Sequence, residues 1–396
     1  MDNFYIFLSL VLLLLPVFFA FGWFAARIDL NTLIKHAKSV PDGLYKAIDA
    51  LIDNKTSIAA QELNEVVEQN KLDNSSNVTK YELVLSLGRL YRQRGENNKA
   101  ILLHQRLLNE PDLNKEQLHR LQFELGKDFQ SAGLVDRAER EFEQLSETTM
   151  AKDANELLLY IYQQDRDWQK AINTAGKLSH DAKTYQFEIA QFYCELAQAS
   201  LFRSDENAAI DYIQSALNAN RKCTRANMLL GDVAVKQGRF QDAIDAYLKI
   251  EQQNHEYLGM VGERIYDAFA SLGQANQGLD VLIGYIKTFP QLDLLSIIYD
   301  KSLVLYGEEH AMETLLSLVR ATPNLIGVYQ LLGIKMSNIN PLWRADTDMM
   351  RTVIGRHVQK SLMYRCRQCY FKSQVFFWHC PACNRWETFT PNRIEI

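Results

Sequence analysis

The sequence lacks the short motifs by which most enzymes are recognised. It contains no Gly-x-x-x-x-Gly-Lys phosphate loop, no Gly-x-Ser-x-Gly nucleophile turn, no His-Glu-x-x-His motif and no dinucleotide-binding fingerprint. No pair of carboxylates stands out as a general acid and base, and the many Asp and Glu residues are typical of solvated helix faces. We therefore expect no catalytic residue and no organic cofactor, and predict that the protein is not an enzyme.

The chain also lacks an excess of positive charge. It carries 43 Lys and Arg residues against 48 Asp and Glu residues, for a net charge of −5 over 396 residues. Proteins that bind nucleic acid usually present a basic field, so we expect no nucleic-acid partner. The length allows two or more domains or one extended array.

Cysteine is scarce, and four of the six cysteines lie in one short C-terminal segment. They form two Cys-x-x-Cys pairs, Cys366 with Cys369 and Cys380 with Cys383. Two thiolates on a tight turn can bind one ion, and a second such turn completes a tetrahedron. The sequence thus predicts one closed four-cysteine site for iron or zinc, with a structural or electron-transfer role. Two disulfides are the alternative, which a reducing compartment disfavours.

The residues around these pairs add detail. Aromatic and β-branched residues in 370–379 favour a β-hairpin that brings the two turns face to face. Asn384 suits the left-handed conformation often needed after the last cysteine. His379 adjoins Cys380 and is a candidate fifth ligand, but a packed histidine is the simpler interpretation.

The N-terminus begins with a long apolar segment. Residues 4–26 carry no charge, and that length spans a bilayer as a helix. Lys and Arg residues follow this segment but do not precede it, so the positive-inside rule places the rest of the chain in the cytoplasm. We predict a transmembrane helix over 1–26 and a juxtamembrane linker over 27–40. The alternative is a cleaved signal peptide, which calls for a positive n-region and a shorter core.

Residues 41–337 repeat a pattern of small and aromatic residues. The clearest copies run from Gly88 to His104, from Gly126 to Phe142 and from Gly231 to Tyr247. A small residue late in the pattern recurs at Ala59, Ala100, Ala138, Ala171, Ala209, Ala243, Gly278 and Ala311. These intervals scatter around the 34-residue tetratricopeptide period, so we predict an array of about eight stacked helical units.

Such an array offers a long concave surface to peptides or proteins. The first helix of each unit normally lines it, so candidate contact residues are Arg89, Arg92, Lys127 and Lys236. The remaining distinctive residues of the array are interpreted as packing residues: His104, Cys194 and Cys223.

The array is joined to the cysteine-rich tail by residues 338–363. Asp346-Thr347-Asp348 predicts the start of a connecting helix, with an apolar side formed by Met349, Met350, Val353, Ile354 and Val358. The helix leads directly into the metal domain at 364–396. We therefore expect the tail to pack against the array, and loss of metal to perturb the last repeats.

These parts together resemble the lipopolysaccharide assembly protein B family of Gram-negative bacteria. The tail carries much of the resemblance, reading Tyr364-Arg365-Cys366-x-x-Cys369 and then Trp378-His379-Cys380-Pro381-x-Cys383. Rubredoxin-type turns usually have Gly after each pair, whereas this chain has Tyr370 and Asn384. The resemblance implies a mainly α fold with an N-terminal transmembrane helix, a tetratricopeptide-repeat superhelix and a small C-terminal rubredoxin- or zinc-ribbon-like β domain.

The resemblance also implies a function. The family is an inner-membrane adaptor that restrains lipopolysaccharide synthesis. It promotes degradation of the deacetylase that commits lipid A synthesis by FtsH, a membrane-anchored ATP-dependent metalloprotease. The implied partners are this protease, the deacetylase, other lipopolysaccharide assembly proteins and the inner membrane, which the chain would cross once; a homo-oligomer stays open. Alternatives are a generic envelope-assembly scaffold and an iron-based, rubredoxin-like electron-transfer protein.

Overall fold

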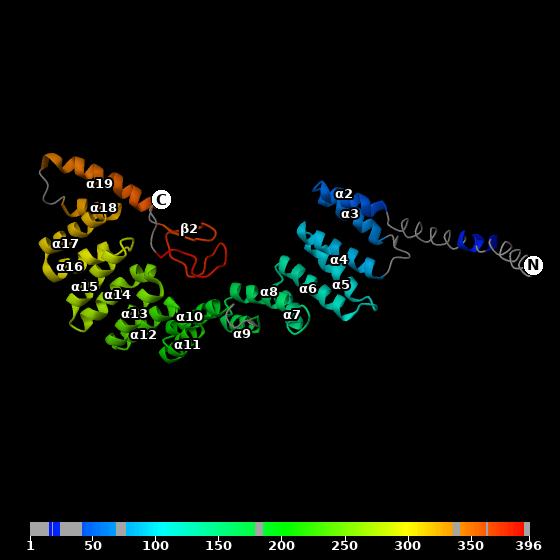
Figure 1. Ribbon diagram of the computed structural model, residues 1–396, viewed down its shortest axis with the longest axis horizontal. Helices are drawn as coiled ribbons and strands as arrows, with labels where there is room; N and C mark the ends of the chain where they lie inside the picture. The colour runs from blue at the N-terminus through cyan, green and yellow to red at the C-terminus, as the bar shows by residue number, and fades with distance from the viewer. Residues whose placement is uncertain are drawn as a thin grey trace, which may run out of the picture. The chain divides into compact units, whose positions relative to one another are not determined.

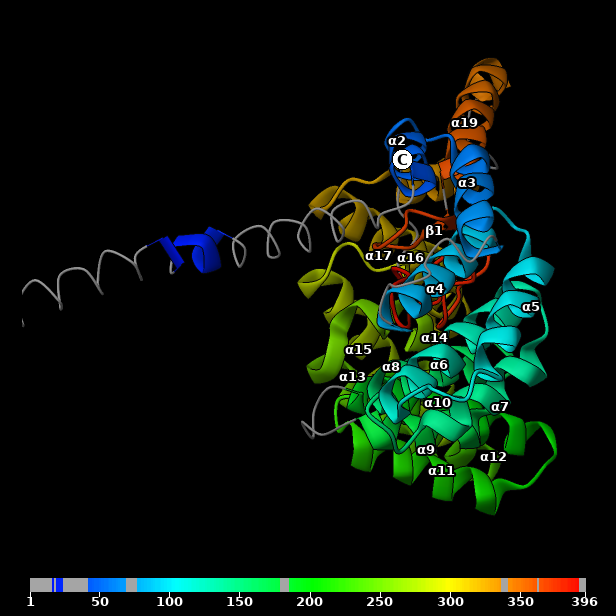
Figure 2. The same ribbon diagram turned by 90° about the vertical axis from the view of Figure 1, so that its right-hand side faces the viewer.

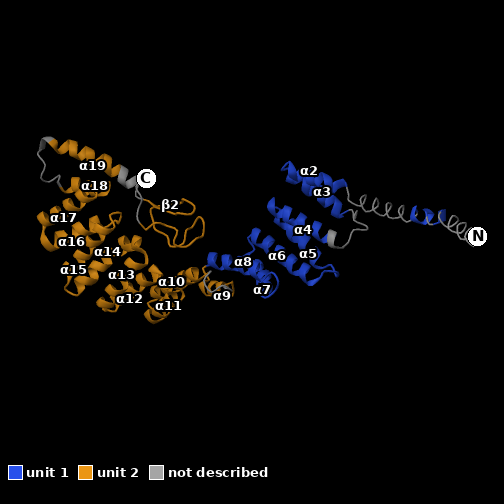
Figure 3. Ribbon diagram, viewed as in Figure 1, with its two compact units in different colours: residues 1–165 blue, residues 166–396 orange. Residues whose placement is uncertain are grey.

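The computed structural model describes residues 16–17, 19–23, 42–68, 77–178, 185–335, 341–361 and 363–391 (Figure 1, Figure 2). The chain divides into two compact units, residues 1–165 and 166–396 (Figure 3). Most of the predicted membrane helix and all of the predicted linker lie outside the described residues. Within the part that is described, no helix is both long and apolar enough to cross a bilayer.

Unit 1 consists of consecutive helices that pack on their neighbours along the chain (Figure 1). They are α2 (Asp42–Ile52), α3 (Thr56–Glu68), α4 (Asn77–Gln93), α5 (Asn97–Leu108), α6 (Lys115–Ser131), α7 (Val135–Leu145) and α8 (Ala151–Gln164).

Unit 2 continues the same helical pattern and ends in a small β region. Its helices are α9 (Trp168–Leu178), α10 (Gln186–Phe202), α11 (Glu206–Ala219), α12 (Thr224–Lys236), α13 (Phe240–Asn254), η1 (His255–Tyr257), α14 (Leu258–Ser271), α15 (Ala275–Thr288), α16 (Leu295–Tyr306), α17 (Glu308–Ala321), α18 (Leu325–Lys335) and α19 (Pro341–Ser361). Strands β1 (Tyr364–Arg365) and β2 (Lys372–Ser373) follow.

The small residues that marked the repeats occupy equivalent buried positions. They lie on the odd-numbered helices from α3 to α17, and all seven alanines among them have no exposed surface. Three glycines that end the first helix of a unit have positive φ, at 77° for Gly95, 74° for Gly133 and 71° for Gly238. The helical-repeat prediction is therefore confirmed.

The glycine that opens the pattern permits close contact between two helices. Three such glycines lie against a ring on the next helix: Gly88 against His104, Gly126 against Phe142 and Gly231 against Tyr247. A Cβ atom at any of these positions would overlap the ring. The spacing of glycine and ring in the sequence thus records a contact between helices rather than a local preference.

We expect Gly231→Ala to lower the free energy of unfolding by about 1–3 kcal/mol, because the new Cβ would overlap the fully buried Tyr247 ring. Gly284→Ala is the matched control in α15, where no atom lies within 4 Å of the added Cβ. Alanine favours a helix over glycine by roughly 0.5–1 kcal/mol, so this control should gain stability. Urea denaturation measures both, and equal shifts for the two variants would contradict the packing argument.

The connecting helix begins earlier than predicted. α19 starts at Pro341 and not at Asp346. Proline suits a first helical position, because its φ is already helical and its missing N–H is not needed there. Of the residues predicted for its apolar side, Met349, Met350 and Val353 are exposed and Ile354 is half-buried, and the side chain of Val358 lies outside those described. α19 instead contacts α18 through Arg351, whose guanidinium lies 5.2 Å from the Tyr329 ring centre.

Candidate metal centre

Each Cys-x-x-Cys pair lies on a turn whose two flanks approach each other. β1 pairs antiparallel with β2, Tyr364 opposite Ser373, and encloses the first turn. A single bridge between His379 and Trp386 encloses the second. The predicted hairpin within 370–379 is therefore wrong. Instead, the backbone segments before and after each cysteine turn pair with each other, and this pairing closes the turn.

The residue after each pair adopts the left-handed conformation without being glycine. Tyr370 has φ 61° and Asn384 has φ 53°. Their amides donate to the carbonyls of Cys366 and Cys380 at 3.0 and 2.9 Å, which closes both turns. The prediction for Asn384 is confirmed. Tyr370 departs from the usual glycine at a cost of roughly 1–2 kcal/mol.

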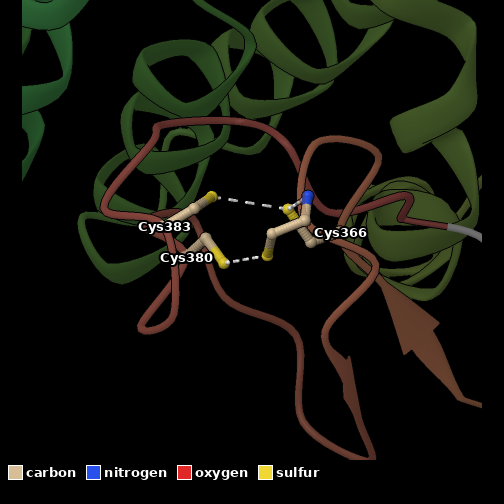
Figure 4. Close-up of side chains that lie close together, drawn as sticks. Cys366, Cys380 and Cys383 are labelled. Carbon is tan, nitrogen blue, oxygen red and sulfur yellow. Dashed lines mark hydrogen bonds between the residues drawn. The ribbon is translucent and has the colours of Figure 1, made fainter. Parts of the chain in front are cut away.

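The four sulfurs of the two turns converge on one point (Figure 4). All four lie within 4.8 Å of one another, and the Sγ atoms of Cys366 and Cys383, like those of Cys369 and Cys380, are 3.7 Å apart. A tetrahedron with metal–sulfur bonds of about 2.3 Å has edges of about 3.8 Å, so the arrangement fits one zinc or iron ion. All six cysteines are free thiols, which excludes the disulfide alternative in this structure.

The environment of the thiols differs from one to the next. Burial opposes ionisation of Cys366, but its hydrogen bond with the Thr388 hydroxyl and the hydrogen bonds from the amides of Cys369 and Gln368 outweigh burial and lower its pKa to about 6. Burial raises the pKa of Cys380 and of Cys383. Among these three thiols only Cys366 has a lowered pKa, and a bound cation would supply the driving force to form thiolates at Cys380 and Cys383.

His379 is packed and does not join the cysteines. Its ring stacks on Trp386, with centroids 4.5 Å apart. Burial lowers its pKa and keeps the imidazole neutral. Among the described residues, the four cysteine sulfurs form the cluster of possible metal ligands, and His379 does not belong to it.

The tail packs on unit 2, against side chains that lie between α9 and η1. Trp386 is 6% exposed and meets the rings of Trp168 on α9 and Phe192 on α10, each at 5.8 Å between centroids. Figure 1 shows the red C-terminal loops beside the green helices that carry these residues. The expectation of packing against the array is confirmed. The expectation that loss of metal perturbs the last repeats stays a prediction.

A second aromatic contact lies beside the first. Trp378 stacks on Tyr257 of η1 at 5.1 Å, and the Arg225 guanidinium lies 5.4 Å from the Trp378 ring centre. Arg225 is only 4% exposed, and its charge is balanced by Glu195 at 2.9 Å. A buried cation with a carboxylate partner and an aromatic neighbour avoids the penalty of an unpaired charge.

Glu387 forms a polar contact of the same interface. Gln191 on α10 donates to its carboxylate at 2.5 Å. Burial raises the pKa of Glu387 to about 7, although the charge of Arg225 and this hydrogen bond act in the opposite direction. Glu387 thus contributes to the interface a carboxyl group that is more easily protonated than an exposed one.

We expect Glu387→Gln to remove a pH dependence of stability. The folded chain holds this proton more tightly than the unfolded chain, whose usual pKa is 4.5. In the native chain, the free energy of unfolding should therefore fall by up to about 3 kcal/mol as the pH rises from about 4.5 to about 7, and should stay at the lower value above about pH 7. The Glu387→Gln variant should lack this fall. Urea denaturation at about pH 5 and about pH 8 measures the change. The exposed Glu147→Gln serves as control; an unchanged slope in the Glu387 variant would refute this assignment.

In unit 1, the cationic residues predicted to contact a partner form ion pairs with carboxylates of the same unit. Arg92 pairs with Glu124 and Asp128 at 2.6 Å, and its side chain is only 12% exposed. Arg89 and Lys127 also approach Glu124, at 2.7 and 3.6 Å. The proposal that Arg92 meets a partner is thus corrected, because its charge balances buried carboxylates. In unit 2, Lys236 is exposed.

These ion pairs between neighbouring repeats were not predicted from the sequence. Asp128 is fully buried and also contacts His104 at 2.5 Å, so His104 is a hydrogen-bonded group as well as a packing residue. Burial opposes the charge on Glu124, but hydrogen bonds from Arg92 and Arg89 outweigh it and lower its pKa. The separation of 36 residues between Arg92 and Asp128, near one repeat, was the available signal.

Fold and site together define a helical-repeat protein with a docked four-cysteine domain. Residues 364–391 match the family described as rubredoxin metal binding domain. Residues 83–118 and 194–256 match tetratricopeptide-repeat families.

Relatives with one name align along nearly the whole chain. Lipopolysaccharide assembly protein B of Escherichia coli strain K12 is 29% identical over 391 residues, covering 98% of both chains. The protein of that name from Haemophilus influenzae is 27% identical over 97% of this chain and 98% of its own. The resemblance predicted from the sequence is thereby confirmed. A solved tetratricopeptide repeat protein from Parabacteroides merdae aligns with 76% of this chain and 99% of its own at 14% identity, with a TM-score of 0.30, too low for a detailed comparison.

Proposed function

We propose that this chain is a non-enzymatic scaffold in lipopolysaccharide assembly. The observation that carries the proposal is the similarity to proteins named lipopolysaccharide assembly protein B, which extends through both the repeats and the tail. Stacked helical repeats present extended surfaces to proteins. Four thiolates around one ion would leave no coordination position for a substrate, so Cys366, Cys369, Cys380 and Cys383 are assigned a structural role.

In its finer form, the proposal is an adaptor at the cytoplasmic face of the inner membrane. The array would hold the lipid A deacetylase close to the protease FtsH, while the predicted membrane helix over 1–26 anchors the complex. Confining partners to one patch of membrane raises their effective concentration without any new contact. This division of labour requires binding surfaces and an anchor, and no catalytic centre in the adaptor itself.

Depletion of the protein tests the adaptor role. We expect the half-life of the deacetylase, followed by pulse-chase labelling, to lengthen on depletion and to recover when the full chain is supplied again. A control membrane protein degraded by the same protease should keep its half-life. An unchanged deacetylase half-life would refute the adaptor role and leave the generic envelope-assembly scaffold.

Electron transfer is the second candidate, because Cys369 lies exposed at the edge of the cluster. A four-thiolate iron site would show a visible absorption that changes reversibly on reduction. Replacement of the metal distinguishes a structural role from electron transfer in cells that depend on the protein. Full function of the protein with redox-inert zinc would exclude electron transfer.

A further inference from the structure

Unit 2 contains a cavity of about 440 Å³ where the ends of α11 and α13 meet the turn before α12. Its lining comprises three cationic residues, five amide side chains and one leucine, and no acidic residue. The three cations are Arg221 and Lys222 in the turn and Lys249 on α13. A cavity of this size lies within the range of small-molecule sites, roughly 300–1,000 Å³.

The cations of this cavity are not used elsewhere in the described chain. None of Arg221, Lys222 and Lys249 takes part in an ion pair among the residues that the structure describes, whereas Arg225, close by, is paired with Glu195. Two helices end here, and each helix end carries about half a negative charge. Three full positive charges exceed that amount, so the cavity keeps a net positive field suited to an anion.

The amides add hydrogen-bonding groups of both kinds. Gln253 donates through Nε2 to the carbonyl of Arg221 at 2.9 Å, which fixes its side chain. Its Oε1 is buried and accepts no hydrogen bond from the described residues. Asn227, another amide of the lining, is 2% exposed. Amide groups can donate and accept, as recognition of neighbouring hydroxyl groups requires.

We propose that this cavity binds a small phosphorylated polyhydroxyl ligand of the sugar-phosphate class. The phosphate lies against Arg221, Lys222 and Lys249, and the hydroxyls bond to the amides. Cations form charge-assisted hydrogen bonds with phosphate oxygens, stronger than those between neutral groups. A free sugar phosphate and the phosphorylated-polyol head of a lipid share this chemistry. The proposal is independent of the adaptor role.

Isothermal titration of the full-length chain in detergent tests the proposal with three probes. We expect glucose 1-phosphate to bind at least tenfold more tightly than either glucose or inorganic phosphate. Arg221→Gln and Lys249→Gln should each weaken that binding by about tenfold, the loss of one charge-assisted hydrogen bond. Lys287→Gln is the matched control, because Lys287 is exposed on α15 and outside the lining.

Vesicles distinguish the source of the ligand. Binding of the chain to phosphatidylcholine vesicles that contain phosphatidylinositol, reduced by Lys249→Gln, would assign the site to a lipid head; binding of glucose 1-phosphate alone would assign a free ligand. Circular dichroism verifies that each variant is folded. The proposal is overturned if no probe binds, or if binding survives both substitutions. It is equally overturned if the variants lose stability without losing affinity, since the cations would then serve only the helix ends.

Discussion

Cys380→Ser is expected to abolish metal binding and to unfold the C-terminal domain. Cys380 is fully buried, and its sulfur lies 3.7 Å from that of Cys369. Apparent binding energies of structural zinc sites are about 10–16 kcal/mol, and in small domains this energy is the folding energy. The matched segment, residues 364–391, is far too short to build a sufficient apolar core. The measurement is metal content per chain, together with the rate of proteolysis within the tail.

Cys194→Ala provides the control for this experiment. Cys194 is also buried, but it lies on α10 beside Cys223, with 3.8 Å between the sulfurs, and outside the metal cluster. Its loss should leave one metal per chain. A Cys380→Ser protein that still held one metal ion, or kept a protected tail, would contradict the assignment of the four cysteines as ligands.

The helical array could be predicted from the sequence because its signals are local. A repeat places Gly231 and Tyr247 on neighbouring helices that are adjacent in the chain, so their spacing is fixed by helix geometry. The cysteine turns are local for the same reason. Each pair and the residue after it form one tight turn, which the left-handed Asn384 completes.

The docking of the tail could not be predicted in the same way. Arg367 contacts Glu256 across 111 residues, and Gln191 contacts Glu387 across 196 residues. No periodicity connects such partners, because their meeting depends on how the array folds as a whole. The ion network of Arg92 lies between these cases. It crosses one repeat only, but charges at that spacing are equally common on solvated helix faces.

Trp386→Ala is expected to release the metal domain from the array while the metal stays bound. The indole is 6% exposed, and its partners Trp168 and Phe192 belong to α9 and α10, not to the cysteine turns. Truncation of a buried tryptophan costs about 3–5 kcal/mol. Hydrogen exchange should therefore speed up in α9 and α10, with metal content unchanged.

Trp343→Ala is the matched control, because this tryptophan is 63% exposed on α19. Exposed substitutions usually change stability by less than about 0.5 kcal/mol, so exchange in α9 and α10 should not respond. If Trp386→Ala also emptied the metal site, docking and metal binding would form one cooperative unit. Under the proposed adaptor role, a longer deacetylase half-life in cells that carry either Cys380→Ser or Trp386→Ala would mean that the adaptor requires the docked position of the tail. If only Cys380→Ser lengthens the half-life of the deacetylase, the adaptor requires the folded metal domain but does not require its docking on the array.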